Sequence, residues 1–283
     1  MAIRNIFIPV FRGAPFRTQL DAALQLCTKD AAHINVVFVR PDAAAIAASI
    51  PDMLVAAGIS VEHIESEGLA AEAEAKAEFE KWRVANGIKS GLVGTDVSSA
   101  TWRERVGPLE AVVVEVGRLS DLTILARPDV YETDVYRAFD AAVFESGRPA
   151  LIVPDHLPQK ILDHIIVAWN SSLQATRAIA GALPLLRIAD QVSVFTAPTH
   201  ADEAIRDLYL GEQLAWHGIR ANYLTPVTEN ESVGEALLGA AREQQATMLV
   251  MGAYTHSRIR EMLLGGVTRH ILRHADIPAL MMH

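Results

Sequence analysis

The sequence predicts an α/β protein made of two tandem domains, each a five-stranded parallel sheet with helices on both faces. Three observations support this prediction. The strand-length segments are continuous apolar runs, which is typical of strands covered by helices on both faces. These runs alternate with helical patterns along the second half of the chain. A weak internal repeat also relates the first half to the second.

The repeat consists of five pairs of similar segments that occur in the same order in both halves. One echo of this kind arises easily by chance, but five in the same order do so much less easily. In residue numbers, first half against second, the pairs are 5–11 and 164–170, 19–24 and 174–179, 110–113 and 235–238, 122–126 and 247–251, and 149–151 and 278–280.

In the second half, five strands alternate with four helices, as in a doubly wound domain. In the first half we expect similar strands around a longer middle segment. The strands of the second half are expected near 164–169, 191–196, 219–224, 247–251 and 278–282, and its helices near 173–187, 201–217, 232–245 and 266–274. The strands of the first half are expected near 3–10, 33–39, 122–126 and 150–153.

The longer middle segment, 65–86, is rich in Ala and Glu and ends at Asn86-Gly87, a good helix C-cap. We expect a helix that covers the sheet with Leu69, Phe79 and Trp82, and a partner-binding helix is the alternative. Two prolines and several polar residues interrupt the pattern over 154–163. The predicted domains are therefore 1–157 and 160–283.

Composition excludes several classes of protein. The formal charge of −9 argues against a nucleic-acid binder, which needs a basic face. The single cysteine, Cys27, excludes an internal disulfide and a four-cysteine zinc site. The first residues lack the pattern of a signal peptide, and no run approaches the roughly 20 apolar residues that span a bilayer. We therefore expect a cytoplasmic protein with no membrane or nucleic-acid partner.

One segment carries the residues expected of a ligand site. Over 247–268, an apolar strand ends at Met251-Gly252, a polar loop follows, and Gly265-Gly266 opens a helix with Val267 and Thr268. Ligands of parallel α/β sheets collect beyond the carboxyl ends of the strands. A helix N-terminus there offers unpaired N–H groups to a phosphate, and glycines let it approach the main chain. The alternative is a tight loop before a packed helix.

This segment, extended to the end of the chain, resembles the C-terminal signature of the universal stress protein family. That signature is Gly, two residues, Gly, nine residues, then Gly followed by Ser or Thr, and in the nucleotide-binding branch it wraps the phosphates and ribose of ATP. The resemblance implies a Rossmann-like, adenine-nucleotide α-hydrolase-like fold. It also implies a dimer in which last strands pair, and a tandem chain can form this pairing between its own halves. A homodimer of the whole chain stays compatible with this pseudo-dimer.

The sequence departs from the signature at several positions. Gly252 and Gly265 match its first and third glycines, but Thr255 replaces the second, and a β-branched residue resists positive φ. Gly266 replaces the Ser/Thr that follows. Asn170 stands where the family has an aspartate that reaches the adenosine. The residues assigned to an ATP, ADP or AMP site, with or without Mg²⁺, are Ala168, Asn170, Val194, Met251, Gly252, Thr255, His256, Arg258, Gly265, Gly266, Val267 and Thr268.

The first half has lost the signature. Arg127 falls where Gly252 does, no glycine follows before Gly147, and Phe11 occupies the aspartate position. We therefore expect no nucleotide in this half.

Enzymatic motifs are missing from the sequence. It contains neither a P-loop nor a G-x-S-x-G elbow, and His270 and His274, at i,i+4, lack the carboxylate of a H-E-x-x-H zinc site. We therefore expect a regulatory or protective stress-response protein with no catalytic or metal-binding residues, although slow ATP hydrolysis is compatible with the sequence. One alternative is a nucleotide-free scaffold for an unidentified protein partner, and another is an enzyme of the adenine-nucleotide α-hydrolase type.

Overall fold

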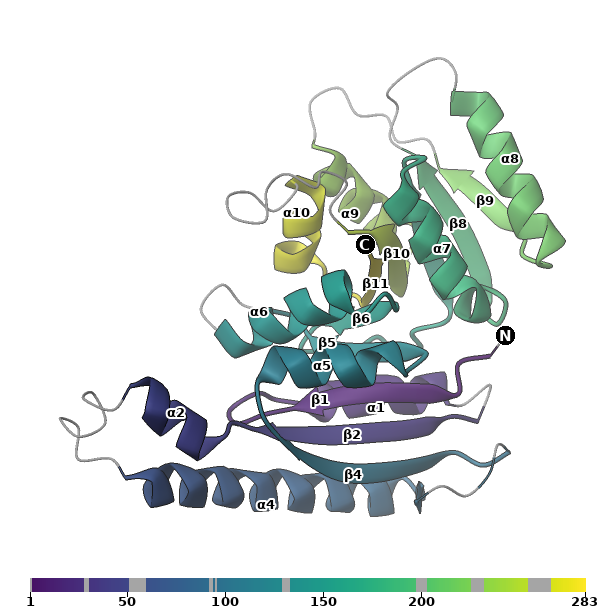
Figure 1. Ribbon diagram of the computed structural model, residues 1–283. Coiled ribbons are helices and arrows are strands. Elements are labelled where there is room, and N and C mark those ends of the chain that lie inside the picture. Colours follow the sequence, from purple (N-terminus) through teal and green to yellow (C-terminus); the bar gives the residue numbers. More distant parts are fainter. Residues whose placement is uncertain are drawn as a thin grey trace.

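The computed structural model describes residues 2–27, 31–50, 60–91, 94, 96–128, 133–196, 203–224, 232–253 and 266–283. The strands in this described part of the chain form a single eleven-stranded sheet, which is flanked by helices (Figure 1). Along this sheet the order is β3-β4-β2-β1-β5-β6-β11-β10-β7-β8-β9. Among the described residues, no helix is both long and apolar enough to cross a membrane.

The second half follows the predicted elements closely. Each helix whose start is described begins at a serine cap: the Ser172 hydroxyl accepts from Ala175 N, and Ser232 forms a reciprocal capping box with Glu235. The elements are β7 (His164–Trp169), α7 (Leu173–Leu186), β8 (Gln191–Thr196), α8 (Glu203–Trp216), β9 (Ala221–Leu224), α9 (Val233–Glu243), β10 (Met248–Gly252), α10 (Gly266–His274) and β11 (Ala279–Met282).

The first half contains the four expected strands and two more. The elements are β1 (Asn5–Val10), α1 (Arg17–Leu26), β2 (His33–Arg40), α2 (Ala43–Ser49), α4 (Val61–Ala85), β3 (Lys89–Ser90), β4 (Ser99–Val106), α5 (Leu109–Arg118), β5 (Leu122–Ala126), α6 (Thr133–Asp140), a π-helical turn η1 (Ala141–Glu145) and β6 (Ala150–Val153). The expectation of five strands in each half is therefore wrong for this half, whose described residues form six strands because the short β3 extends the sheet beyond β4.

The middle helix is α4, which runs along the β4 end of the sheet (Figure 1). It ends as expected, with Asn86 as the C-cap and Gly87 in the left-handed region at φ 65°. Phe79 and Trp82 are fully buried as expected, and both lie in one hydrophobic cluster with strand residues of the sheet. Leu69 is 47% exposed, so its assignment to the covering face is wrong.

Both halves repeat one strand order. In the second half it is β9-β8-β7-β10-β11 and in the first β4-β2-β1-β5-β6, with all neighbours parallel within each half. The two last strands, β6 and β11, pair antiparallel with Leu151 opposite Leu280. The pairing of last strands within one chain is therefore confirmed.

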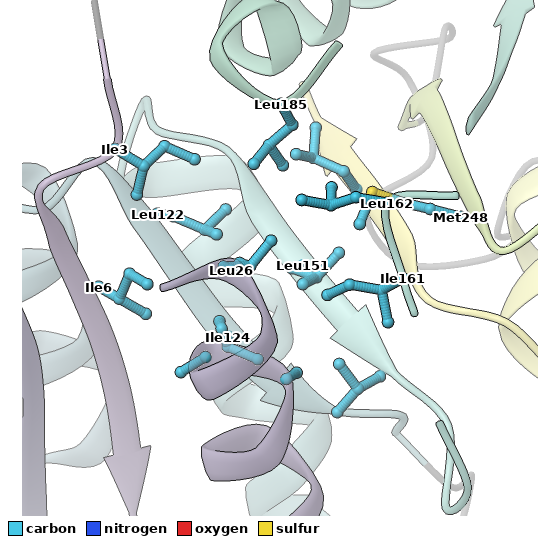
Figure 2. Close-up of a cluster of buried hydrophobic side chains, with 14 of the residues drawn as sticks. Ile3, Ile6, Leu26, Leu122, Ile124, Leu151, Ile161, Leu162, Leu185 and Met248 are labelled. Atoms are coloured by element: carbon cyan, nitrogen blue, oxygen red, sulfur yellow. The ribbon is translucent and has the colours of Figure 1, made fainter. Parts of the chain in front are cut away.

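Hydrophobic side chains cover both faces of the sheet. One cluster packs α1, α4, α7 and α8 against the sheet, and the other packs α5, α6, η1, α9 and α10. Each cluster contains residues of both halves. Figure 2 shows part of the first, where Ile161 and Leu162 of the segment that joins the halves lie near Leu151 of β6 and Met248 of β10. The halves thus share their core across β6 and β11.

Candidate functional site

The expected site lies where β7 and β10 end side by side. These strands are parallel neighbours, with Met251 of β10 in register with Ala168 of β7. The helices that follow them belong to opposite faces, since α7 packs in the first cluster and α10 in the second. A crevice between neighbouring strands whose connections diverge in this way is where open α/β sheets bind ligands.

A short turn joins β7 to α7. Asn170 is exposed, and its Oδ1 accepts a hydrogen bond from the Ser172 backbone N–H at 3.2 Å. Ser171 has a φ of 58°, a left-handed conformation that is costly for a residue with a side chain. Ser172 then caps α7. Among the described residues the Nδ2 group of Asn170 makes no hydrogen bond, so it is available to a ligand acceptor.

Gly252, at the end of β10, lies against the first turn of α7. A Cβ atom at this position would come within 2.6 Å of Ala175 N and 2.7 Å of the Gln174 carbonyl carbon. Both are backbone atoms, so a side chain could be accommodated only by moving the helix. Close packing of strand end and helix start therefore requires glycine here, and this contact ties the β10 end to the Asn170 turn.

The other strand residues assigned to the site are buried or half-buried in the sheet. Ala168 is half-buried at the strand end, whereas Met251 is buried in the second cluster. Val194 is 0% exposed in the first cluster, two residues before the end of β8, so its side chain is not open to a ligand in this conformation, and its assignment as a neighbour of the base stays a prediction. Residues on a β-strand alternate between its faces, and the face of Val194 is sealed by helices.

At the start of α10, exposure falls from residue to residue. Gly266 is exposed, Val267 is half-buried, and Thr268 is 4% exposed on the inner side of the helix. The Thr268 hydroxyl is therefore not presented at the surface in this conformation. Four further residues assigned to the site lie outside the described residues: Thr255, His256, Arg258 and Gly265.

The C-terminal half of α10 carries two histidines beside α9. The rings of His270 and His274 lie 4.6 Å apart between centroids, and burial together with the His274 charge lowers the pKa of His270. The Ser232 hydroxyl and backbone N–H lower the pKa of Glu235, with the two histidines adding to the effect. Over the described part of the chain, no group of three or more His, Cys, Asp or Glu side chains could hold a metal ion.

A comparison with known protein families identifies the second half of the chain. The universal stress protein family model matches residues 162–283, from the start of β7 to the end of the chain. Residues 162–283 belong to the universal stress protein family. No curated protein matches the chain by sequence.

Solved structures extend the fold to the whole chain. A universal stress protein from Archaeoglobus fulgidus DSM 4304 is similar with a TM-score of 0.70 at 17% identity, over 98% of this chain and 96% of that one. A Pseudomonas aeruginosa UCBPP-PA14 protein provisionally assigned to the family is similar with a TM-score of 0.55 at 14% identity, over 99% and 93%. The chain therefore has the fold of two universal stress protein domains in tandem.

In the first domain, the strand end that corresponds to Gly252 carries a charged side chain, Arg127. Arg127 reaches into the second domain. Its Nη1 donates to the Ala275 carbonyl oxygen at 2.9 Å, and its Nη2 lies 3.7 Å from Asp155 Oδ2. Because Ala275 directly follows α10, the guanidinium lies at the negative end of that helix dipole.

Two features of the two domains escaped sequence reasoning. Sequence reasoning did not identify Ser172 as a helix cap, although a serine three residues before Ala175, ahead of an apolar run, is a recognisable helix-start signal. The contact between Arg127 and Ala275 had no local signal, because it depends on how the two domains pair.

Proposed function

We propose that the second domain binds an adenine nucleotide at the crevice between the ends of β7 and β10. The observation that carries the proposal is that β7 and β10 are parallel neighbours at the switch in strand order, so the Asn170 turn and Gly252 lie at adjacent strand ends. Along the chain, α10 is the next described element after β10. The nucleotide would be ATP, ADP or AMP, and ATP would bring Mg²⁺ with it. The family match over this half supports the same assignment.

The residues at the crevice fit such a ligand. Gly266, the first described residue of α10, is exposed, and the unpaired N–H groups of a helix start favour phosphate. The Asn170 amide can donate to a ribose hydroxyl or an adenine ring nitrogen. Gly265, His256 and Arg258 add a second glycine and two side chains that can contact phosphate, as the sequence of the loop indicates.

A binding and regulatory role fits this site better than turnover. The described turn between β7 and α7 offers amide and hydroxyl groups but no carboxylate or imidazole to act as a general base. We propose a stress-response protein that senses or stores nucleotide in the cytoplasm, and not an enzyme. Any oligomer would form through surfaces other than β6 and β11, whose edges are paired within the chain.

The second candidate is a nucleotide-free scaffold for a protein partner. Three features favour it: the buried side chain of Thr268, the engagement of Asn170 Oδ1 within its own turn, and Thr255 in place of the second signature glycine. An enzyme of the adenine-nucleotide α-hydrolase type has no corresponding observation in its favour.

The test is titration calorimetry of nucleotide-stripped protein with ATP and Mg²⁺. The Gly265→Asp variant places a negative charge at the proposed phosphate position and is expected to abolish binding of one ATP per chain. The control is Gly13→Asp in the loop after β1, where an added Cβ meets nothing within 4 Å and Asp tolerates the φ of 81° better than most residues. Loss of binding in the control alone would place the site in the first domain, and absence of heat at millimolar ATP would favour the scaffold.

A further inference from the structure

A separate cleft lies between the two domains, away from the ends of β7 and β10. The first domain contributes the segments before β1, β5 and β6, and the second contributes the outer side of α7 and the ends of α8 and β11. Its volume of about 270 Å³ is just below the range of about 300–1,000 Å³ typical of small-molecule sites. Its polar lining residues are Asp121, Arg148, Arg187 and His217.

The lining of this interdomain cleft contains more basic than acidic side chains. Arg187 is exposed just after α7, and its guanidinium makes no hydrogen bond or ion pair with any described residue. Arg148 donates through Nε to the Arg118 carbonyl oxygen at 3.2 Å, and no described carboxylate pairs with its guanidinium. Two arginines thus line one small cleft, and neither guanidinium is paired with a described carboxylate.

The single carboxylate that lines the interdomain cleft, Asp121, already accepts hydrogen bonds from the backbone. Asp121 Oδ2 accepts from the backbone N–H groups of Arg4 and Asn5 at 2.9 and 3.0 Å, which fixes the start of β1. The His217 ring adds a further polar group, with Nε2 3.2 Å from Gln213 Nε2. The cleft therefore keeps a net positive charge in a protein whose overall charge is −9.

The remaining walls of the interdomain cleft are apolar. Ile3 and Pro149 come from the first domain, and Leu183, Pro184 and Met282 from the second. Such walls hold a hydrocarbon body, while guanidinium groups bind carboxylate or phosphate oxygens in pairs of parallel hydrogen bonds.

We propose that the interdomain cleft binds a small organic anion, a carboxylate or phosphate monoester on an apolar body. Arg148 and Arg187 bind the anionic group, and the apolar walls take the body. Because both domains line the cleft, its ligand stabilises their pairing and raises the unfolding temperature of the whole chain. This proposal does not depend on nucleotide binding by the second domain.

The test measures binding of benzoate and phenyl phosphate to the full chain by calorimetry and saturation-transfer NMR, with neutral benzamide as the uncharged probe. We expect the two anions to bind and benzamide to bind at least tenfold more weakly, a difference of about 1.4 kcal/mol. Arg187→Gln and Arg148→Gln are each expected to weaken binding of the anions by about tenfold. Ala180→Leu, which fills the cleft from the exposed side of α7, is expected to abolish it.

The control variant is Arg242→Gln on α9, which removes an exposed arginine that does not line the interdomain cleft. It should bind both anions as the unaltered protein does, and so should Gly265→Asp. The proposal is overturned if benzamide binds as tightly as benzoate, if neither arginine variant weakens binding, if no probe binds at millimolar concentration, or if ATP competes with benzoate.

Discussion

Replacement of Gly252 by alanine tests how the end of β10 is fixed to α7. The added Cβ would lie 2.6 Å from Ala175 N and 2.7 Å from the Gln174 carbonyl carbon, whereas ordinary contact begins at 3.4 Å. The gap must therefore widen by about 0.8 Å, and the atoms that must move are helix backbone. Overpacking of this kind costs about 1–3 kcal/mol, so Gly252→Ala should lower the free energy of unfolding by that amount.

Urea denaturation at neutral pH measures this change, and α9 supplies the matched control. Gly239 lies inside that helix, and an added Cβ there meets nothing within 4 Å. Gly239→Ala should therefore be neutral or stabilise the protein by about 0.5–1 kcal/mol, because alanine is the better helix former. If Gly252→Ala proves as stable as Gly239→Ala, the close approach of strand and helix is not what requires glycine, and the reasoning fails.

A shift of α7 would also displace the Asn170 turn. Ser172 caps the helix, and its backbone N–H donates to Asn170 Oδ1, so the turn and the first helical residues move together. If the second domain binds ATP as proposed, Gly252→Ala should weaken that binding beyond its effect on stability. Calorimetry well below the unfolding temperature separates the two effects.

Three other predictions follow from contacts outside the site. Arg127→Met should lower the free energy of unfolding by about 1–2 kcal/mol in urea, because it removes a charged hydrogen bond to Ala275 O across the domains. Burial and the neighbouring Glu104 raise the pKa of Glu72, so the folded chain holds that proton more tightly than the unfolded chain, and the contribution of Glu72 to stability is lost as pH rises above 4.5. Glu72→Gln should therefore stabilise the protein at pH 7 and lose that advantage at pH 4. Burial also raises the pKa of the Cys27 thiol, so alkylation by iodoacetamide at pH 7.5 should be at least about tenfold slower in the folded than in the urea-unfolded protein.

Controls for these predictions come from exposed side chains. Arg17→Met breaks an exposed i,i+4 ion pair with Asp21 and should change stability by less than about 0.5 kcal/mol. If Arg127→Met lowers the free energy of unfolding no more than Arg17→Met does, the interdomain contact does not stabilise the protein as proposed. A constant difference between Glu72→Gln and the unaltered protein from pH 4 to 7 would contradict the raised pKa, and equal rates of alkylation in folded and unfolded protein would contradict burial of Cys27.

The sequence by itself determined the architecture of the second domain. Its strands β7, β8, β10 and β11 are mostly buried, so they read as continuous apolar runs, and serines mark the starts of α7 and α9. Strand β4 was missed in the first domain because its second half, from Arg103 to Val106, is exposed and mostly charged. A strand at the periphery of a sheet lacks the apolar signal of a central one.

The tertiary structure alone decided which side chains meet. Val194 was assigned to the site from its place near a strand end, but the face of the sheet on which it lies is covered by helices. Gly252 was read as a ligand contact, and the structure adds that helix backbone occupies the space of its missing side chain. The contact of Arg127 with Ala275 and the cleft beside Arg187 exist only because β6 pairs with β11. Local sequence encodes burial and helix starts, whereas contacts between residues more than a hundred positions apart depend on the strand order and on the packing of the two domains.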